Sequence, residues 1–383
     1  MTGEKLTESQ QQIDAMLCRL LKGESLSWPY GDSNQAQIEL FLERSSVHGV
    51  QASIWTSLQP GSWPQVIVEQ LHKASLEAAS WELAHRHALV QVLSGFAAEN
   101  IGYMLFKGTA LAYSFYANPV LRFRCDTDML VSGYSKTKAE KLLKGLGFEC
   151  SSPAEELVYY QQSWRLNSSH CGTHAIDLHW KLNNSEVLAN LFSYEELRAR
   201  GDEVTICGVK TFVPCKVDAV LIACLHSAGH EGIPYLVNGN SYLGGSRLVW
   251  LYDLHLLISH FSLQDWHDLT ERAVQKGLGN TCAVILDRVR EKFSTVMFLD
   301  GLEILASDKD GKATVYLDSG PIMRMWLDIT ACGSWKAKLA FVQQLFFPSE
   351  AYMRQKYASG SQWLFVLYIR RSIEGIYRRL HAN

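Results

Sequence analysis

Apolar residues recur at helical spacing through residues 1–98. The longest such segment, residues 66–99, has no interior proline, and its pattern predicts one long helix. The pattern changes at residue 101, where short apolar runs begin to alternate with glycine turns and an asparagine–proline pair. The first part of the chain is therefore expected to be helical and to end near residue 98.

The middle of the chain combines strand and helix patterns. Strands are predicted at 101–106, 126–131, 157–164 and 173–182, a hairpin with a glycine turn at 204–213, and helices at 108–117 and 136–147. After residue 216 the pattern is helical again, with successive segments typical of a bundle. The predicted fold class is α+β. A small mixed-sheet core at 99–215 follows N-terminal helices at 1–98, and a C-terminal helical domain occupies 216–383.

Composition narrows the class of protein. With 47% apolar and 20% charged residues, the 383-residue chain has the composition of a folded soluble protein. Its net charge of −3 gives no general attraction to nucleic acid or membranes. The nine cysteines form no CxxC pair, and the N-terminus lacks the apolar core of a signal peptide. No apolar run approaches the roughly 20 residues of a membrane helix. We expect a cytoplasmic protein without a membrane partner, and nucleic acid is disfavoured as a partner.

Two aspartates interrupt the apolar strand predicted at 126–131. Residues two apart on a strand point to the same face, so Asp126 and Asp128 project together. Two ionised carboxylates side by side repel each other, and burial penalises both. A divalent cation removes this repulsion, and paired carboxylates suit Mg²⁺ that also holds substrate phosphates. The alternative is a strand end at which both aspartates reach solvent.

A third carboxylate changes the balance between these readings. Asp177 is a lone acid within another apolar strand, and His179 lies on the same face. If this strand pairs with the strand at 126–131, three carboxylates meet at one edge of a sheet. Such a group can hold one or two metal ions, and two-metal sites favour in-line phosphoryl or nucleotidyl displacement. The sequence predicts Asp126, Asp128 and Asp177 as catalytic metal ligands, with Mg²⁺ as the cation and Mn²⁺ as a substitute.

Gly108 and Thr109 open a predicted helix directly after a strand. The backbone N–H groups of a helix N-terminus, together with the Thr109 hydroxyl, offer hydrogen-bond donors to a triphosphate. Lys107 either adds positive charge at the phosphates or is an ordinary lysine at a strand end. All three residues are predicted to bind the nucleotide.

Four further residues are candidates for the cleft. Arg122 and Arg124 precede the aspartates at strand spacing, and they either contact phosphate or form ion pairs. His226 and His230 share one helix face at i, i+4, a spacing that suits zinc, but the glutamate of the HExxH protease motif is absent. The histidines are predicted to contact the nucleotide or the acceptor, with core packing as the alternative. Asp253, within an apolar helix, is interpreted as structural.

Together these motifs resemble the DNA polymerase beta-like nucleotidyltransferase superfamily, with its Gly–Ser pair opening a helix, a D-x-D strand and a later lone aspartate. The segments FKGTALAY, DTDMLV, IDLHW and RLVWLYDL are similar to a bacterial group of uncharacterised nucleotidyltransferase-family proteins, over residues 99–300. On this resemblance, Gly108 and Thr109 match the Gly–Ser pair, the three aspartates match the metal carboxylates, and Arg122 matches the family's arginine. Threonine replaces the usual serine, and the interval to the first aspartate is longer than in compact members.

The resemblance implies a Mg²⁺-dependent nucleotidyltransferase that moves an NMP from an NTP donor to an acceptor hydroxyl. Asp126 and Asp128 would hold the metals, while Asp177 would hold the second metal and act as general base. The expected acceptor is a small molecule such as an aminoglycoside-like sugar, a peptide or a protein. Two alternatives use the same residues: a phosphotransferase or hydrolase, and a non-catalytic nucleotide-binding interaction protein.

Overall fold

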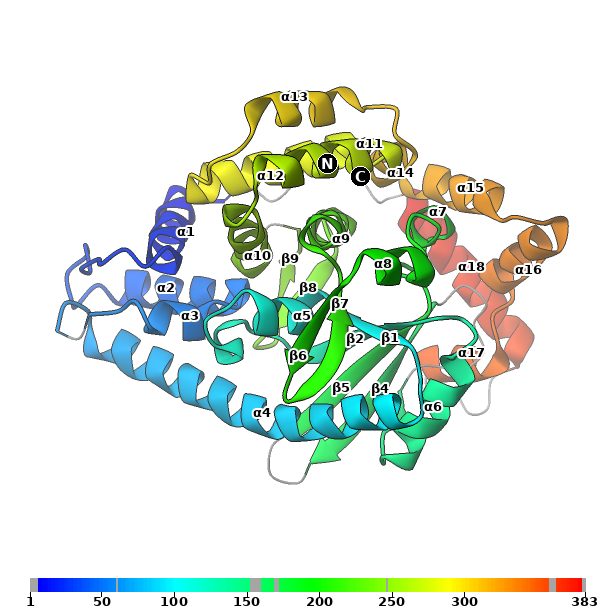
Figure 1. The fold of residues 1–383 in the computed structure, drawn as a ribbon, viewed down its shortest axis with the longest axis horizontal. Helices are drawn as coiled ribbons and strands as arrows, with labels where there is room; N and C mark the ends of the chain where they lie inside the picture. The colour runs from blue at the N-terminus through cyan, green and yellow to red at the C-terminus, as the bar shows by residue number, and fades with distance from the viewer. Residues whose placement is uncertain are drawn as a thin grey trace.

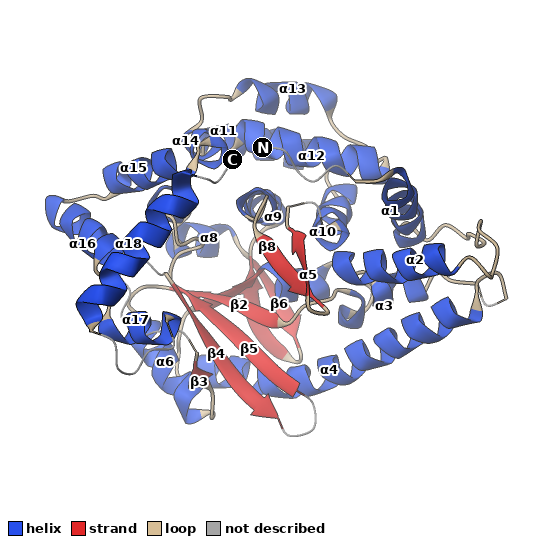
Figure 2. Ribbon diagram, turned by 180° about the vertical axis from the view of Figure 1, so that it is seen from behind, coloured by secondary structure: helices blue, strands red, loops and turns tan. Residues whose placement is uncertain are grey.

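A mixed sheet lies in the middle of the molecule, between the long helix α4 (Gln65–Ala98) and a group of helices on the other side (Figure 1). The computed structural model describes residues 6–59, 61–151, 160–168, 172–245, 247–357 and 363–380. Figure 2 shows the same sheet from behind, with α4 running beneath it. Helix α4 confirms the long helix predicted at 66–99. Helices α1 (Glu8–Leu21), α2 (Gln35–His48) and α3 (Gln51–Trp55) precede it.

The central sheet has five strands among the described residues, in the order β1–β2–β5–β4–β3. The strands are β1 (Tyr103–Phe106), β2 (Asp126–Val131), β3 (Glu149–Cys150), β4 (Gln161–Ser168) and β5 (Gly172–His179). Strands β2 and β5 pair in parallel, and the other neighbours are antiparallel. The mixed sheet confirms the predicted α+β class. Of the strand predicted at 157–164, residues 157–159 lie outside the described residues.

The two faces of the sheet differ in what they bury. One face packs on α4 and on α6 (Lys136–Gly145), because alternate residues of each strand point the same way. This apolar layer contains Ala88, Leu89, Val92, Leu93, Phe96, Met129, Val131, Ile176 and Leu178. The residues between them in β2 and β5, including the three aspartates, therefore point to the opposite face.

Short elements connect the sheet to the C-terminal half. They are α5 (Lys107–Ser114), the 3₁₀ helix η1 (Pro119–Leu121), α7 (Glu186–Ala189), α8 (Tyr194–Arg200), β6 (Asp202–Ile206) and β7 (Val209–Val213). The β6–β7 hairpin confirms the one predicted at 204–213. Helix α5 ends at Ser114, earlier than in the predicted 108–117, and the Asn118 side chain then caps η1 by accepting from the Val120 N–H at 3.0 Å.

Successive helices follow, as predicted: α9 (Lys216–Gly229), α10 (Leu248–Ser259), α11 (Leu263–Gln275) and α12 (Gly279–Phe293). A hairpin that was not predicted, β8 (Pro234–Val237) with β9 (Asn240–Leu243), lies between α9 and α10. The remaining helices are α13 (Leu299–Ser307), α14 (Lys312–Asp318), α15 (Pro321–Ala331), α16 (Trp335–Phe346), α17 (Glu350–Lys356) and α18 (Leu364–Leu380). Within the described part of the chain, no helix is both long and apolar enough to span a membrane.

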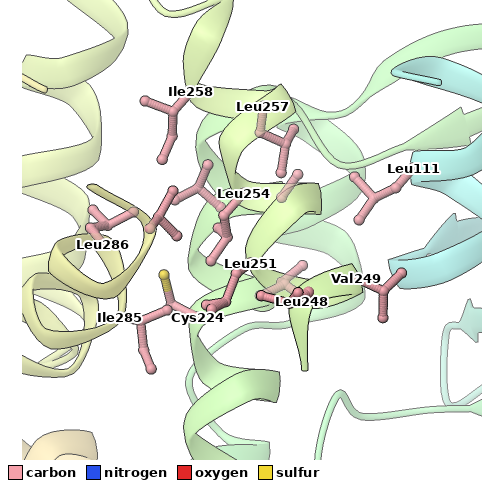
Figure 3. Packing of buried hydrophobic residues seen from close by; sticks show 14 of the residues in the cluster. Leu111, Cys224, Leu248, Val249, Leu251, Leu254, Leu257, Ile258, Ile285 and Leu286 are labelled. Atoms are coloured by element: carbon pink, nitrogen blue, oxygen red, sulfur yellow. The ribbon is translucent and has the colours of Figure 1, made fainter. Parts of the chain in front are cut away.

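A single apolar core joins the N-terminal helices to those after residue 216. Ile13 of α1 and Phe41 of α2 belong to the same cluster of buried side chains as Leu254 and Leu286. Figure 3 shows part of this cluster, with Leu111 of α5 facing α10. The shared core anchors α5, which adjoins the aspartates, to the helical part. The three-part division at 98 and 215 stays a prediction.

Candidate active site

Asp126, Asp128 and Asp177 lie on one face of the central sheet. In the parallel pairing of β2 with β5, Asp128 stands directly opposite Asp177, and Asp126 stands opposite Ala175. The pairing expected from the sequence is confirmed, and it brings the three carboxylates together.

Asp128 is the best compensated of the three carboxylates. Its Oδ1 accepts a hydrogen bond from Lys107 Nζ at 2.7 Å and one from His179 Nε2 at 2.9 Å. Burial opposes ionisation of Asp128, but Lys107 and His179 outweigh it and hold the pKa of this carboxyl below its usual range. Among the described residues none donates a hydrogen bond to Oδ2, which is left for a ligand.

Asp126 and Asp177 are compensated less well. Burial, followed by the charges of Asp128 and Asp177, raises the pKa of Asp126 to about 7. Burial and the charge of Asp128 also raise the pKa of Asp177. Among the described residues, Asp128 is the only one of the three aspartates with ion pairs, which it forms with Lys107 and His179. The group therefore carries more negative charge than the neighbouring cations balance.

This donor set fits a divalent cation. Asp128, Asp177 and His179 each place one ligand atom within 4.8 Å of the others, and Asp126 lines the adjoining cavity. Carboxylate oxygens are the ligands that Mg²⁺ and Mn²⁺ prefer, and a cation would neutralise the excess negative charge. His179 was not among the predicted ligands. Its Nε2 is bonded to Asp128, while its buried Nδ1 has no hydrogen-bond partner among the described residues.

A sharp backbone turn places Lys107 beside the carboxylates. Strand β1 ends at Phe106 and α5 begins at Lys107, whose φ of 53° lies in the left-handed region. That conformation costs a residue with a side chain about 1–2 kcal/mol. At Gly108 a Cβ would lie 3.0 Å from Arg122 Nη1, so glycine lets this guanidinium approach. Among the described residues, no side chain caps the first turn of α5, and Lys107 and Gly108 of this turn line the cavity.

Thr109 lies behind the site rather than in it. Its side chain is fully buried, and its hydroxyl pairs with Thr127 Oγ1 at 2.8 Å. Thr127 in turn meets His85 Nε2 of α4 at 2.8 Å, on the sheet face opposite the aspartates. The predicted contact of the Thr109 hydroxyl with phosphate is therefore not retained, because it would require this buried chain to break. The hydroxyl instead ties α5 to β2 and α4.

The aspartates line a cavity of about 310 Å³ between the sheet and helices α9 and α10. Lys107 and Gly108 line it, and so do His226 and His230 at the end of α9. The two imidazole rings lie 4.4 Å apart, and His226 packs edge-on against Trp250 at 4.8 Å. Burial, reinforced by the charge of Lys107, lowers the pKa of both histidines, so both are neutral at pH 7. Their predicted contact with substrate stays a prediction.

Arg122 lines the cavity but is held by a carboxylate. Its Nε and Nη2 donate to Asp253 of α10 at 3.2 and 2.7 Å, and the Tyr116 hydroxyl donates to the same carboxylate at 2.7 Å. Burial opposes the charge of Arg122, but Asp253 outweighs it and raises the pKa of the guanidinium. Arg124 is also held by a carboxylate, since its Nη2 donates to Glu82 of α4. Asp253 thus has a structural role, and a phosphate contact by Arg122 stays a prediction.

Breaking this buried pair is expected to destabilise the fold. Asp253→Asn leaves Arg122 as a buried cation without a counter-charge, and the free energy of unfolding should fall by about 3–5 kcal/mol. Urea denaturation measures the loss. A double variant, Arg122→Met with Asp253→Leu, removes both charges and should recover most of it. Wild-type stability of Asp253→Asn would contradict the structural role.

Sequence reasoning placed His179 on the strand face of Asp177 but did not assign it as a ligand. Arg247 and Trp250 line the cavity, but neither carried a local signal. They line the same cavity as the aspartates only because α10 packs across from the sheet, and the two segments are far apart in the chain.

Comparisons with known proteins give one family and several distant structures. The sequence profile of a family described as "Uncharacterised nucleotidyltransferase" matches residues 34–294. The antibiotic-resistance factor ANT(2'')-Ia has 12% identity and a TM-score of 0.35, over 51% of this chain and 92% of that one. An antigenic nucleotidyltransferase-like protein from Paracoccidioides brasiliensis has 12% identity and a TM-score of 0.38, over 57% and 92%. No curated protein sequence matches.

Proposed function

Because this chain belongs to the family of uncharacterised nucleotidyltransferases, we propose that it transfers a nucleoside monophosphate from an NTP to an acceptor hydroxyl with the help of a divalent cation. The observation that carries the proposal is the group of Asp126, Asp128 and Asp177 on one sheet face at the cavity. Mg²⁺ is the preferred cation, and Mn²⁺ is a substitute. The acceptor is a small molecule, a peptide or a protein.

The three carboxylates are the residues that would hold the cation. When bound, a divalent cation neutralises phosphate charge and lowers the pKa of an acceptor hydroxyl. Lys107 and His179 both bind Oδ1 of Asp128, and they thereby fix the direction of its Oδ2. Supporting contacts of this kind keep a ligand set oriented before substrate arrives.

The triphosphate is assigned to the N-terminus of α5. Gly108 lines the cavity there, and the first turn of the helix has no side-chain cap, so its N–H groups suit an anion. Lys107 adds positive charge next to this turn. His226 and His230 form the opposite wall, where neutral imidazoles pack against the nucleotide or donate single hydrogen bonds.

The reaction forms one bond and breaks another. The acceptor oxygen attacks the α-phosphorus, the bond from that phosphorus to the bridging oxygen of the β-phosphate breaks, and pyrophosphate leaves. The acceptor hydroxyl loses its proton to Asp177. A carboxylate is a common general base for a proton transfer of this kind.

Cation-dependent nucleotide binding tests the proposal. Non-hydrolysable analogues of ATP, GTP, CTP and UTP are titrated calorimetrically into the wild-type protein, once with Mg²⁺ and once with EDTA. We expect at least one analogue to bind with Mg²⁺ and its affinity to fall about tenfold or more in EDTA, which corresponds to at least ~1.4 kcal/mol. Failure of all four to bind with Mg²⁺ would reject the proposal.

Product analysis then separates the alternatives. Hydrolysable NTPs are incubated with the protein and a small-molecule extract that supplies acceptors. Nucleotidyl transfer releases pyrophosphate, whereas a phosphotransferase leaves an NDP. Binding without either product would indicate a non-catalytic nucleotide-binding protein.

A further inference from the structure

The cations that line the cavity are not equivalent. Three of the lining cations pair with carboxylates: Lys107 with Asp128, Arg122 with Asp253, and Arg124 with Glu82. Arg247, immediately before α10, also lines the cavity. In the described part of the chain, no carboxylate lies within ion-pairing distance of Arg247, and its one protein hydrogen bond is to a backbone carbonyl. The protein thus leaves the charge of Arg247 without a counter-charge.

The contacts of Arg247 orient its guanidinium while leaving most of its donors unused. Its Nε donates to the Val47 carbonyl at 3.1 Å. The guanidinium carbon lies 4.9 Å from the ring centroid of Tyr235 and 5.4 Å from that of Trp250. No residue of the described chain accepts a hydrogen bond from Nη1 or Nη2. Arginine has five N–H donors in one plane, so those of both terminal nitrogens are available to a ligand.

The backbone makes room for this guanidinium. Gly49 ends α2 with a φ of 68°, and a Cβ at this position would lie 2.9 Å from Arg247 Nη2. A side chain at residue 49 would therefore push the guanidinium out of its place, in addition to the strain of the positive φ. Burial lowers the pKa of Arg247, as expected for a cation that has lost water without gaining a counter-charge.

We propose that Arg247 forms an anion-binding subsite of the cavity, which takes a phosphate or carboxylate group of a substrate. The proposal rests on the proposed nucleotidyl transfer and defines the chemistry of one of its substrates. The group comes either from the triphosphate of the donor or from an acidic acceptor. Both present paired oxygens that a planar guanidinium binds through two parallel hydrogen bonds. His226 and His230, being neutral, do not supply this charge.

The charges of the cavity lining also disfavour a polycationic acceptor such as the aminoglycoside-like sugar considered above. The acidic residues that line the cavity are Asp126, Asp128, Asp177 and Asp253. The first three are assigned to the cation, and Asp253 is engaged by Arg122 and Tyr116. Among the described residues that line the cavity, no carboxylate is left for ammonium groups, whereas the guanidinium of Arg247 has no counter-charge. The charges of the lining match an acidic acceptor, or an uncharged acceptor next to a triphosphate that Arg247 binds.

Two calorimetric titrations on wild type, Arg247→Gln and Arg247→Lys test the subsite. In the first, the Mg²⁺ complex of the tightest-binding NTP analogue is titrated into each protein. In the second, inorganic phosphate is titrated into each protein already saturated with that complex. Arg290→Gln serves as the control, because Arg290 is exposed and, within the described chain, its side chain pairs only with Asp287 on its own helix. Thermal denaturation verifies that each variant is folded.

A loss of about tenfold or more in affinity for Arg247→Gln in the first titration supports the subsite and identifies the triphosphate as its ligand. The same loss confined to the second titration also supports it and identifies a separate anion, supplied by the acceptor. Arg247→Lys keeps the charge but loses the planar fork, so its affinity should be intermediate. Unchanged affinities of folded Arg247→Gln in both titrations would overturn the subsite.

The proposed function is tested by different data. Absence of Mg²⁺-dependent NTP binding by the wild type counts against nucleotidyl transfer, whether or not Arg247 binds an anion. Phosphate titrated into nucleotide-free wild type and Arg247→Gln then still decides the subsite, since equal phosphate affinities of these two proteins would reject it.

Discussion

Asp128→Asn is expected to abolish nucleotidyl transfer and to destabilise the fold at the same time. The amide cannot hold a divalent cation as a carboxylate does, and turnover should fall by about 10³-fold or more, corresponding to roughly 4 kcal/mol of transition-state stabilisation. The same change leaves Lys107 and His179 without the carboxylate that binds them. The free energy of unfolding should fall by about 2–4 kcal/mol.

The pH dependence follows from the lowered pKa of Asp128. A carboxyl whose folded-state pKa lies below the ordinary 3.8 stabilises the fold at pH values above that, and the contribution is lost as the pH falls further. Wild type and Asp128→Asn should therefore differ fully near neutral pH and converge in acid. Pyrophosphate release and urea denaturation at several pH values measure both effects, with Asp287→Asn, a half-exposed site outside the cavity lining, as the control. Wild-type turnover in a folded Asp128→Asn protein would remove Asp128 from the mechanism.

The cluster of three aspartates was predictable because successive side chains of a strand alternate between the two faces of the sheet. Asp126 and Asp128 share a face in any strand, and β2 has the predicted bounds of 126–131. The pairing of β2 with β5 joins segments that are far apart in the chain. An acid within an apolar strand nevertheless needs polar or charged groups beside it, and few positions in the sheet provide them. Asp177 therefore pointed to a common site before the register was known. Their excess negative charge follows directly from that register.

Other features depended on conformation or on distant contacts that no short pattern reports. The Thr109 hydroxyl turns inward to Thr127, and Lys107 adopts a left-handed φ that is unusual for lysine. Asp253 pairs with a residue 131 positions away in the chain. The β8–β9 hairpin did carry a local signal, because Asn238 and Gly239 adopt positive φ and an Asn–Gly pair is typical of a two-residue hairpin turn.

Asp126 and Asp128 lie two residues apart on the same strand face, yet they should affect stability with opposite signs. Lys107 and His179 contact Asp128, whereas no described residue forms an ion pair with Asp126. The charge of Asp128 thus stabilises the fold, whereas the charge of Asp126 destabilises it unless a ligand is bound. Buried groups whose charge the fold does not balance are typical of functional sites.

Asp126→Asn is accordingly expected to abolish turnover but to stabilise the metal-free protein. Because burial and two neighbouring carboxylates raise the pKa of Asp126 from 3.8 to about 7, the folded state holds this proton longer than the unfolded state does. Ionisation of Asp126 therefore destabilises the wild type as the pH rises from 3.8 to about 7, and the variant lacks this contribution. In EDTA at pH 8, urea denaturation should show Asp126→Asn more stable than wild type by about 1–3 kcal/mol, with a smaller difference at pH 5. Added Mg²⁺ should reverse the order, because binding stabilises the intact carboxylate group more. A variant less stable than wild type in EDTA at pH 8 would mean that the charge of Asp126 serves the fold rather than a cation.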